Sequence, residues 1–277
     1  MTAQVGKAMR LKRVIDPAGV SLICALDHGM TSPTFLEPLA DIGARTAEAV
    51  AGGANVIMMS KGMIRLAEPA FSPTTSLALL LSASANPAEA QPQVVQIARV
   101  EEALRLGADA VVLFTALGGA AEPQMVRTLA AVGRECAALG MPLIAEAEFP
   151  TTYAQVEELK EQYGFEYLRR NVRLCAELGA DVVKTNWPGH EDLFGSLVEA
   201  AGGIPVVLAG GSRVEDGELL WRMERAMAAG GIGCSVGRNI FMHRSPEAIT
   251  RALSRVIRER WSAAEAVKEL AEGEEAS

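Results

Sequence analysis

Short apolar runs alternate along the chain with longer amphipathic stretches. The first run, residues 20–26, ends in Asp27, His28 and Gly29, as expected for a buried strand that reaches solvent. Further runs of strand length follow at 55–59, 76–81, 110–114, 142–148, 181–186, 205–209 and 233–236. Helical spacing is found at 2–16, 39–50, 100–106, 122–139, 153–178 (interrupted at Gly164), 192–200, 216–229 and 245–260, and in the tail after 262.

Four joints between a helix and the next strand share one short phrase, beginning at Gly53, Gly107, Gly179 and Gly231. In Gly107-Ala108-Asp109 and Gly179-Ala180-Asp181 a glycine stops the helix, a small residue packs, and the strand begins. Such repeated joints indicate right-handed βαβ units and a parallel sheet. Eight strands in about 250 residues are typical of a TIM barrel. A doubly wound sheet is the alternative, although no G-x-G-x-x-G follows an early strand.

The sequence therefore predicts an α/β protein with one domain, residues 1–277, built as a (β/α)8 barrel. The barrel core spans about 20–260, after an N-terminal lead-in helix and before a C-terminal helical tail. The 49% of hydrophobic residues allow a large core, and the 5% of aromatic residues suit closely packed helices over a sheet.

Charge and cysteine usage narrow the class of protein further. With 26 basic and 34 acidic side chains the net charge is −8, which argues against a nucleic-acid or anionic-membrane partner. The four cysteines stand singly and the three histidines lie in separate loops, so we expect reduced thiols and neither a metal nor another cofactor. No apolar segment follows the basic N-terminus as in a signal peptide, and no run approaches the roughly 20 residues of a membrane span. A cytoplasmic protein is expected.

The stretch from Asp181 to Asn186 contains the first candidate for catalysis. Alternate side chains of a strand share a face, so Val182, Lys184 and Asn186 point the same way. A strand that is apolar on both faces is buried on both, and burial lowers the pKa of a lysine toward the value that a nucleophilic amine needs. The alternative is a surface or salt-bridged lysine near the end of a strand.

Other polar residues fall at the carboxyl ends of the predicted strands, which form the catalytic face of a barrel. Glycine-rich turns follow the last two strands, where backbone N–H groups and an arginine can hold a phosphate. The alternatives are ordinary turns and a structural salt bridge. Together with the lysine, the carboxylates and the phosphate loops suggest Schiff-base chemistry on a phosphorylated carbonyl compound. The residues are Asp27, His28, Lys61, Glu146, Glu148, Gly210, Gly211, Ser212, Gly237 and Arg238.

Five motifs together resemble one known family. The chain is similar to the archaeal-type class I fructose-bisphosphate aldolases (DhnA-type), which include 2-amino-3,7-dideoxy-threo-hept-6-ulosonate synthase and to which a thiolase of autoinducer-2 breakdown is related. The resemblance runs from residue 20 to 260 in the same order. The motifs are Ala25-Leu26-Asp27-His28-Gly29, Lys61-Gly62, Asp181-Val182-Val183-Lys184-Thr185-Asn186, Ala209-Gly210-Gly211 and Val236-Gly237-Arg238-Asn239-Ile240-Phe241.

This resemblance implies a role for most of the candidate residues. Lys184 is expected to form the Schiff base and Asp27 to move protons, or in the alternative to pair with Lys184. His28 is expected to support the site through hydrogen bonds, and Lys61 to contact the substrate phosphate. Family members assemble into rings and decamers, so a homo-oligomer is expected, with a phosphorylated sugar as the small-molecule partner. The phosphate is assigned to Gly210, Gly211, Ser212, Gly237 and Arg238.

The chain departs from the family on the fifth strand. Where the family has a Tyr-Pro pair whose tyrosine donates a proton, this sequence has Phe149-Pro150. Glu146 and Glu148 share one face of that strand, and tagatose-bisphosphate-type aldolases resemble the chain in having a glutamate there. We expect Glu146 to replace the tyrosine, with Glu148 or Tyr153 as alternatives; in another reading both glutamates only balance Lys184.

The favoured function is a class I aldolase, a lyase acting on a phosphorylated ketose such as fructose 1,6-bisphosphate. Alternatives are a transaldolase-like or thiolase-like transferase of the same family, an isomerase that forms no covalent bond, and a phosphosugar-binding barrel without catalysis. The missing tyrosine is the best argument for the last of these.

Overall fold

Eight parallel strands close into a barrel in the computed structural model, which describes residues 2–30, 32, 34–84, 94–115, 117, 121–149 and 164–275. Around the barrel the strands follow the order β1-β10-β9-β8-β7-β6-β3-β2. Every predicted barrel strand is confirmed to within one residue at each end. The strands are β1 Ser21–Ala25, β2 Val56–Met59, β3 Ser76–Leu80, β6 Ala110–Phe114, β7 Leu143–Ala147, β8 Val182–Thr185, β9 Val206–Ala209 and β10 Gly233–Val236.

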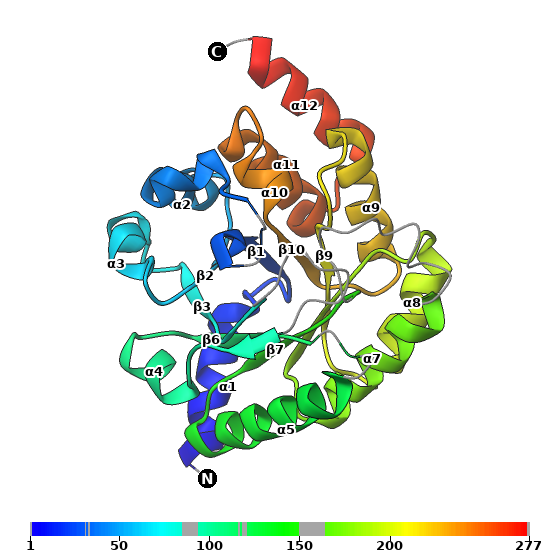
Figure 1. The fold of residues 1–277 in the computed structure, drawn as a ribbon. Helices are drawn as coiled ribbons and strands as arrows, with labels where there is room; N and C mark the ends of the chain where they lie inside the picture. The colour runs from blue at the N-terminus through cyan, green and yellow to red at the C-terminus, as the bar shows by residue number, and fades with distance from the viewer. Residues whose placement is uncertain are drawn as a thin grey trace.

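Helices form a ring around the strands, as in a TIM barrel (Figure 1). The N-terminal lead-in helix and the C-terminal helix that were predicted are both present, and the latter packs on α9 and α11. Of the predicted helix 153–178, the part before 164 lies outside the described residues. The helices are α1 Thr2–Val14, α2 Ile42–Ala51, α3 Ile64–Ala67, α4 Val100–Arg105, α5 Glu122–Leu139, α7 Phe165–Glu177, α8 Glu191–Ala200, α9 Asp216–Ala228, α10 Arg238–Phe241, α11 Pro246–Glu259 and α12 Ala263–Glu275.

Three short features differ from the prediction. Helix α2 begins at Ile42 instead of residue 39, because a 3-10 turn at Glu37–Asp41 precedes it and the Asp41 side chain caps it. Strands β4 (Ser82–Ser84) and β5 (Val94–Gln96) pair in an antiparallel manner where the pattern predicts only a loop after β3. The four-residue helix α10 was not predicted from the hydrophobic pattern, because it is too short to show a helical period.

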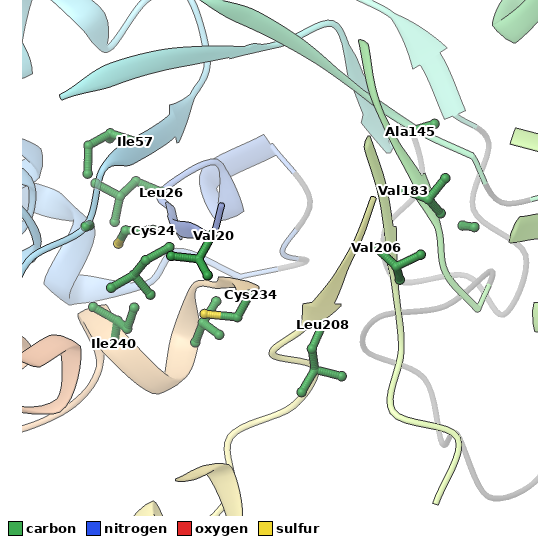
Figure 2. Close-up of a cluster of buried hydrophobic side chains, with 14 of the residues drawn as sticks. Val20, Cys24, Leu26, Ile57, Ala145, Val183, Val206, Leu208, Cys234 and Ile240 are labelled. Atoms are coloured by element: carbon green, nitrogen blue, oxygen red, sulfur yellow. The ribbon is translucent and has the colours of Figure 1, made fainter. Parts of the chain in front are cut away.

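Strand alternation divides the core into two clusters. One fills the barrel and contains Val182 and Ile144, and the other lies between the barrel and its helices and contains Val183. Figure 2 shows part of the outer cluster, where Val183 and Val206 lie near one another. A side chain two residues beyond Val182 therefore points into the barrel.

Helix α1 closes the amino-terminal end of the barrel. Its Val14 belongs to the inner core cluster. Lys7 of α1 forms an ion pair of 2.8 Å with Asp181, and Arg13 pairs with Asp109, so the helix is tied to the starts of two strands. The carboxyl-terminal end of the barrel carries polar residues, among them Asp27, Glu146 and Lys184. Within the described ranges, no helix is long and apolar enough to cross a membrane.

Candidate active site

Lys184 lies near the carboxyl end of β8, and its side chain points into the barrel on the face of Val182. Its amine donates a hydrogen bond of 2.7 Å to Oε1 of Glu146 and forms an ion pair of 2.8 Å with Oε1 of Glu148. The lysine is 8% exposed, and both glutamates are buried too. Of the two alternatives to a buried nucleophile, a surface lysine is excluded by this burial. A salt-bridged lysine agrees with the structure, because both glutamates form ion pairs with the amine.

The two glutamates reach the amine because of strand register. Glu146 on β7 pairs directly with Lys184 on β8, and Glu148 is the next residue on the same face. Below this level the same faces carry Ile144 and Val182, which belong to the inner core cluster. The charged groups thus lie toward the carboxyl-terminal end of the barrel, and the apolar inner core lies beneath them on the amino-terminal side.

This cluster changes the proton affinity of its members. Burial raises the pKa of Glu146 to about 7, because the partial compensation by Lys184 is opposed by the nearby carboxylates. For Lys184, burial acts to lower the pKa, but the neighbouring carboxylates, led by Glu146, raise it above its ordinary value. The lowered lysine pKa expected from the sequence is thus wrong for this state, since the pattern could not show three carboxyl groups around one amine.

Asp27 follows β1 and is buried close to this cluster. Burial acts to raise its pKa, but the interaction with His28 and the charge of Lys184 lower the pKa below its ordinary value. Nδ1 of His28 lies 3.4 Å from Oδ1 of Asp27, and the His28 ring meets Phe241 edge to face at 5.1 Å. His28 therefore supports Asp27 from the side of α10.

Gly237 brings β10 close to this pair. A Cβ atom on Gly237 would overlap the His28 ring and would lie 2.7 Å from the carbonyl oxygen of Ala25. Only glycine fits this approach, which places the start of α10 beside the end of β1. The predicted residues Gly237 and His28 are thus direct neighbours.

The glycine-rich turn after β9 and the start of α10 are also joined. Nη2 of Arg238 donates a 2.8 Å hydrogen bond to the carbonyl oxygen of Gly211. Gly211 has a φ of 62°, in the left-handed region that favours glycine. A Cβ on Gly210 would lie 3.0 Å from a methyl group of Val236, so this turn packs tightly against the end of β10. The two predicted phosphate loops therefore form one unit.

Asn239 is the residue that fastens this unit, and the sequence did not reveal its role. Its Nδ2 donates to the carbonyl oxygens of Gly210 and Ser212, both at 3.1 Å, and its Oδ1 accepts from the N–H of Val214 at 2.9 Å. The side chain is buried. The sequence pointed to Asn239 only as part of the motif from Val236 to Phe241, without a role of its own.

Lys61 is not brought to the cluster. Its amine pairs with Glu102 at the start of α4 at 2.8 Å, and its side chain is 45% exposed. It follows the outward-facing Met59 by two residues, and Met59 belongs to the outer core cluster. The expected phosphate contact of Lys61 thus has no support from this placement.

A cavity of about 600 Å³ opens beside the lysine at the carboxyl ends of β7, β8 and β9. Glu148 and Asn186 line it on the side of the cluster, and the turn from Gly210 to Ser212 lines it on the side of α9. Its outer wall is aromatic and includes Trp187 and Trp221, whose rings meet edge to face at 5.8 Å. Neither tryptophan is among the site residues predicted from the sequence.

Phe149, at the position of the family's tyrosine, also lines this cavity. Its N–H donates to Oδ1 of Asn186 at 2.8 Å, and its ring stacks on Tyr167 at 6.1 Å. The ring has no proton to transfer, so Glu146 and Glu148 are the titratable groups of this strand in the described residues. Pro150 and Tyr153 lie outside those residues.

The arrangement offers a nucleophile with acid and base groups at contact distance. An amine that is protonated beside Glu146 can pass its proton to that carboxyl group and then attack a carbonyl carbon. No group of three or more histidine, cysteine or acidic side chains is placed to hold a metal ion among the residues that the structure describes.

Comparisons with known proteins agree with this chemistry. A family model for DeoC/LacD family aldolases matches residues 21–243. A protein of Halobacterium salinarum named 2-amino-3,7-dideoxy-D-threo-hept-6-ulosonate synthase is 34% identical over 91% of this chain and 91% of its own length. A protein of Streptomyces griseus named 2-amino-4,5-dihydroxy-6-oxo-7-(phosphonooxy)heptanoate synthase is 31% identical over 92% of this chain and 91% of its own.

Solved structures resemble the chain as well. An archaeal fructose 1,6-bisphosphate aldolase superposes with a TM-score of 0.80 at 26% identity, over 91% of this chain and 99% of that one. A Schiff-base-forming fructose-1,6-bisphosphate aldolase superposes with a TM-score of 0.78, also at 26% identity and over the same shares of the two chains.

Proposed function

The chain belongs to the DeoC/LacD aldolase family, and on that premise we propose that it is a class I aldolase that cleaves a phosphorylated ketose through an imine on Lys184. The observation that carries this proposal is the buried amine of Lys184, which lies 2.7 and 2.8 Å from two carboxyl groups. Such a lysine becomes a nucleophile as soon as a neighbouring carboxylate accepts its proton.

The first part of the proposed reaction forms the imine. Lys184 passes a proton to Glu146, and the neutral amine attacks the ketone carbon while the carbonyl oxygen takes a proton back from Glu146. The carbinolamine nitrogen then returns a proton to Glu146, and Glu146 passes it to the hydroxyl group, which leaves as water and gives the iminium. A carboxyl group with a pKa of about 7 is suited to both directions near neutral pH.

The second part breaks the carbon–carbon bond. Asp27, whose pKa is lowered, accepts the proton of the hydroxyl group on the carbon that becomes the aldehyde. The bonding electrons move into the iminium group and give an enamine on Lys184. Asp27 then passes this proton to the enamine carbon, and water attacks the resulting iminium carbon to release the second product and restore the amine.

The phosphate of the ketose is assigned to the unit formed by the turn after β9 and the start of α10. Asn239 holds the carbonyl oxygens of Gly210 and Ser212 on its own side. The N–H of Gly210 donates to the carbonyl oxygen of Ser235 and the N–H of Val214 to Asn239, so we assign the phosphate oxygens to the N–H groups of Gly211 and Ser212 between them. Arg238, which borders the turn through Gly211, adds a positive charge.

A second candidate is a synthase or transaldolase-like transferase that uses the same lysine but passes the enamine to another aldehyde. The identities of 34% and 31% to the two named synthases favour it. The two candidates share every step up to the enamine. Release of free aldehyde from a ketose phosphate without an added acceptor supports the lyase, and an absolute requirement for an acceptor supports the synthase.

Borohydride trapping tests the covalent step. Incubation with dihydroxyacetone phosphate and borohydride should leave a stable mass adduct on the peptide that contains Lys184. The adduct should vanish in Lys184→Met and persist in Lys268→Met, which alters an exposed lysine of α12. Absence of an adduct on the wild-type protein would contradict the proposal and favour an isomerase or a binding protein.

Two further expectations accompany this proposal. The family's ring and decamer assemblies suggest a homo-oligomer, which sedimentation at several protein concentrations would test. A cytoplasmic location is expected from the composition and the single cysteines, and fractionation of the source cells would test it.

A further inference from the structure

We infer that Asn186 is a substrate-binding residue. Its side-chain amide donates a hydrogen bond to the hydroxyl group on the carbon next to the imine carbon, on the side away from the phosphate. This inference rests on the proposed function and adds a residue that selects which ketones react with the lysine. It is carried by the position of the Asn186 amide and by its fixed orientation.

Asn186 follows β8 directly, on the same face as Lys184 and two residues beyond it. The register of β7 and β8 pairs Ala147 with Thr185, so Glu148 and Asn186 are the next pair. Nζ of Lys184 lies 2.8 Å from Oε1 of Glu148, which brings the amine up to the level of Asn186. A ketone carbon bonded to this amine therefore lies at the level of the Asn186 side chain.

The backbone of Phe149 fixes the orientation of the Asn186 amide. Oδ1 of Asn186 accepts the N–H of Phe149 at 2.8 Å, so the donor Nδ2 occupies the other position of the amide. Among the described residues Nδ2 has no hydrogen-bond partner, and the half-buried Asn186 lines the cavity beside the lysine. A half-buried donor that no protein group satisfies, next to a reactive amine, is suited to an oxygen atom of the substrate.

The proposed reaction leaves one oxygen atom near the imine carbon without a partner. Glu146 serves the ketone oxygen, which leaves as water, and the N–H groups of Gly211 and Ser212 are assigned to the phosphate. The hydroxyl group on the carbon beyond the ketone remains, and it stays on the substrate through every step. In the enamine this oxygen lies in the plane of the double bond, so a hydrogen bond from Asn186 would fix which face of the enamine meets an aldehyde.

Two ketone phosphates that differ only in this hydroxyl group test the inference. Dihydroxyacetone phosphate carries the hydroxyl, and hydroxyacetone phosphate has hydrogen in its place. Each is incubated with the protein and borohydride, and the concentration that gives half of the maximal adduct on Lys184 is measured. The ratio of the hydroxyacetone phosphate value to the dihydroxyacetone phosphate value should fall about fivefold or more in Asn186→Leu, because the variant lacks the hydrogen bond. The same ratio in wild type and variant would overturn the inference and leave Asn186 as a support for the backbone of Phe149.

Two arginine residues near the cavity do not affect this ratio. Arg222 lines the cavity and pairs with Glu218 at 2.7 Å, and Arg213 lines a neighbouring cleft. Both ligands carry the same phosphate, so a contact of either arginine with it changes both concentrations alike. Arg222→Ala is therefore the matched control and should keep the wild-type ratio. A fall in Arg222→Ala as large as in Asn186→Leu would contradict a specific role of Asn186.

The wild-type protein supplies a second criterion, which holds even if Asn186→Leu does not fold. It should trap dihydroxyacetone phosphate at a lower concentration than hydroxyacetone phosphate. Equal values, or the reverse order, would remove the inference but retain the covalent step on Lys184. Failure of both ligands to leave an adduct on Lys184 would instead remove the proposed function, and the inference with it.

Discussion

Lys184 and Glu146 are direct neighbours in the register of β8 and β7, and their side chains meet at 2.7 Å inside the barrel. The pairing holds a proton between an amine and a carboxyl group whose pKa is about 7. A nucleophile and the group that takes its proton are therefore fixed by backbone hydrogen bonding, on strands instead of on loops. This rigidity suits proton transfer over a fixed distance.

Lys184→Met should abolish turnover, because a thioether cannot form an imine. We also expect the variant to unfold more easily at neutral pH, by about 3 kcal/mol, since removing one member of a buried ion pair leaves the carboxylates uncompensated. This loss of stability should become smaller as the pH falls, because protonation removes the charge of the carboxyl groups. Thermal unfolding of both proteins between pH 5 and pH 8 measures this. A variant with a tenth of the wild-type rate would contradict the covalent mechanism.

The stability of the wild-type protein should depend on pH through Glu146. Its pKa is raised from an ordinary value of 4.5 to about 7, so the folded protein binds this proton more tightly than the unfolded chain. The stabilisation is complete below about pH 4.5 and is lost as the pH rises to about 7, at up to roughly 1.4 kcal/mol per pH unit. Denaturant unfolding of the wild type and of Glu146→Gln between pH 5 and pH 7.5 tests this. Parallel profiles of the two proteins would show that Glu146 titrates normally.

Asn239→Ala should weaken phosphate binding without slowing the chemical step at saturation. Its three hydrogen bonds to one turn contribute about 1 kcal/mol each, so loosening that turn should raise the dissociation constant of inorganic phosphate about tenfold or more. The fluorescence of Trp187 and Trp221, which line the adjoining cavity, can report this binding. Asn239→Asp retains only the acceptor for the Val214 N–H and should be no better than the alanine variant. Unchanged phosphate affinity in both would show that the turn keeps its shape without Asn239.

The sequence predicted the features that depend on local periodicity. Alternation alone put Lys184 on the same face as Val182, although it did not tell which face is inward, and eight strand runs were enough to infer the barrel. Contacts between distant segments could not be predicted in this way. The bonds of Asn239 to Gly210 and Ser212 join residues far apart in sequence, and no period in the chain refers to them. The same is true of the raised pKa of Lys184, which results from carboxylates on two other strands.

Lys61 illustrates a different limit. Its position after β2 was correct, but one residue decides whether a side chain at a strand end faces the mouth or the helices. The short motif around Lys61 gave no register, so the exposed pair with Glu102 could not be foreseen.

The sharpest prediction separates the two glutamates of β7. Both contact the amine of Lys184, yet only Glu146 pairs with it in the strand register, and its pKa is raised to about 7. Glu146→Gln keeps the shape of the side chain but removes its titrating proton, so the turnover rate should fall by about 10²–10⁴-fold. Glu148→Gln is the matched control. Its turnover rate should fall much less, because proton transfer through Glu146 remains possible.

The trapping experiment shows which step is lost in each variant. Slow accumulation of the borohydride adduct on Lys184 should persist in Glu146→Gln, because the amine can still lose its proton to Glu148 or to water. A near-normal rate for Glu146→Gln with a large loss for Glu148→Gln would assign the role to Glu148. Near-normal rates for both would move proton transfer away from this strand, and Tyr153→Phe would then be the variant to measure. Phe149 cannot replace the family's tyrosine in any of these outcomes, because its ring has no ionisable group.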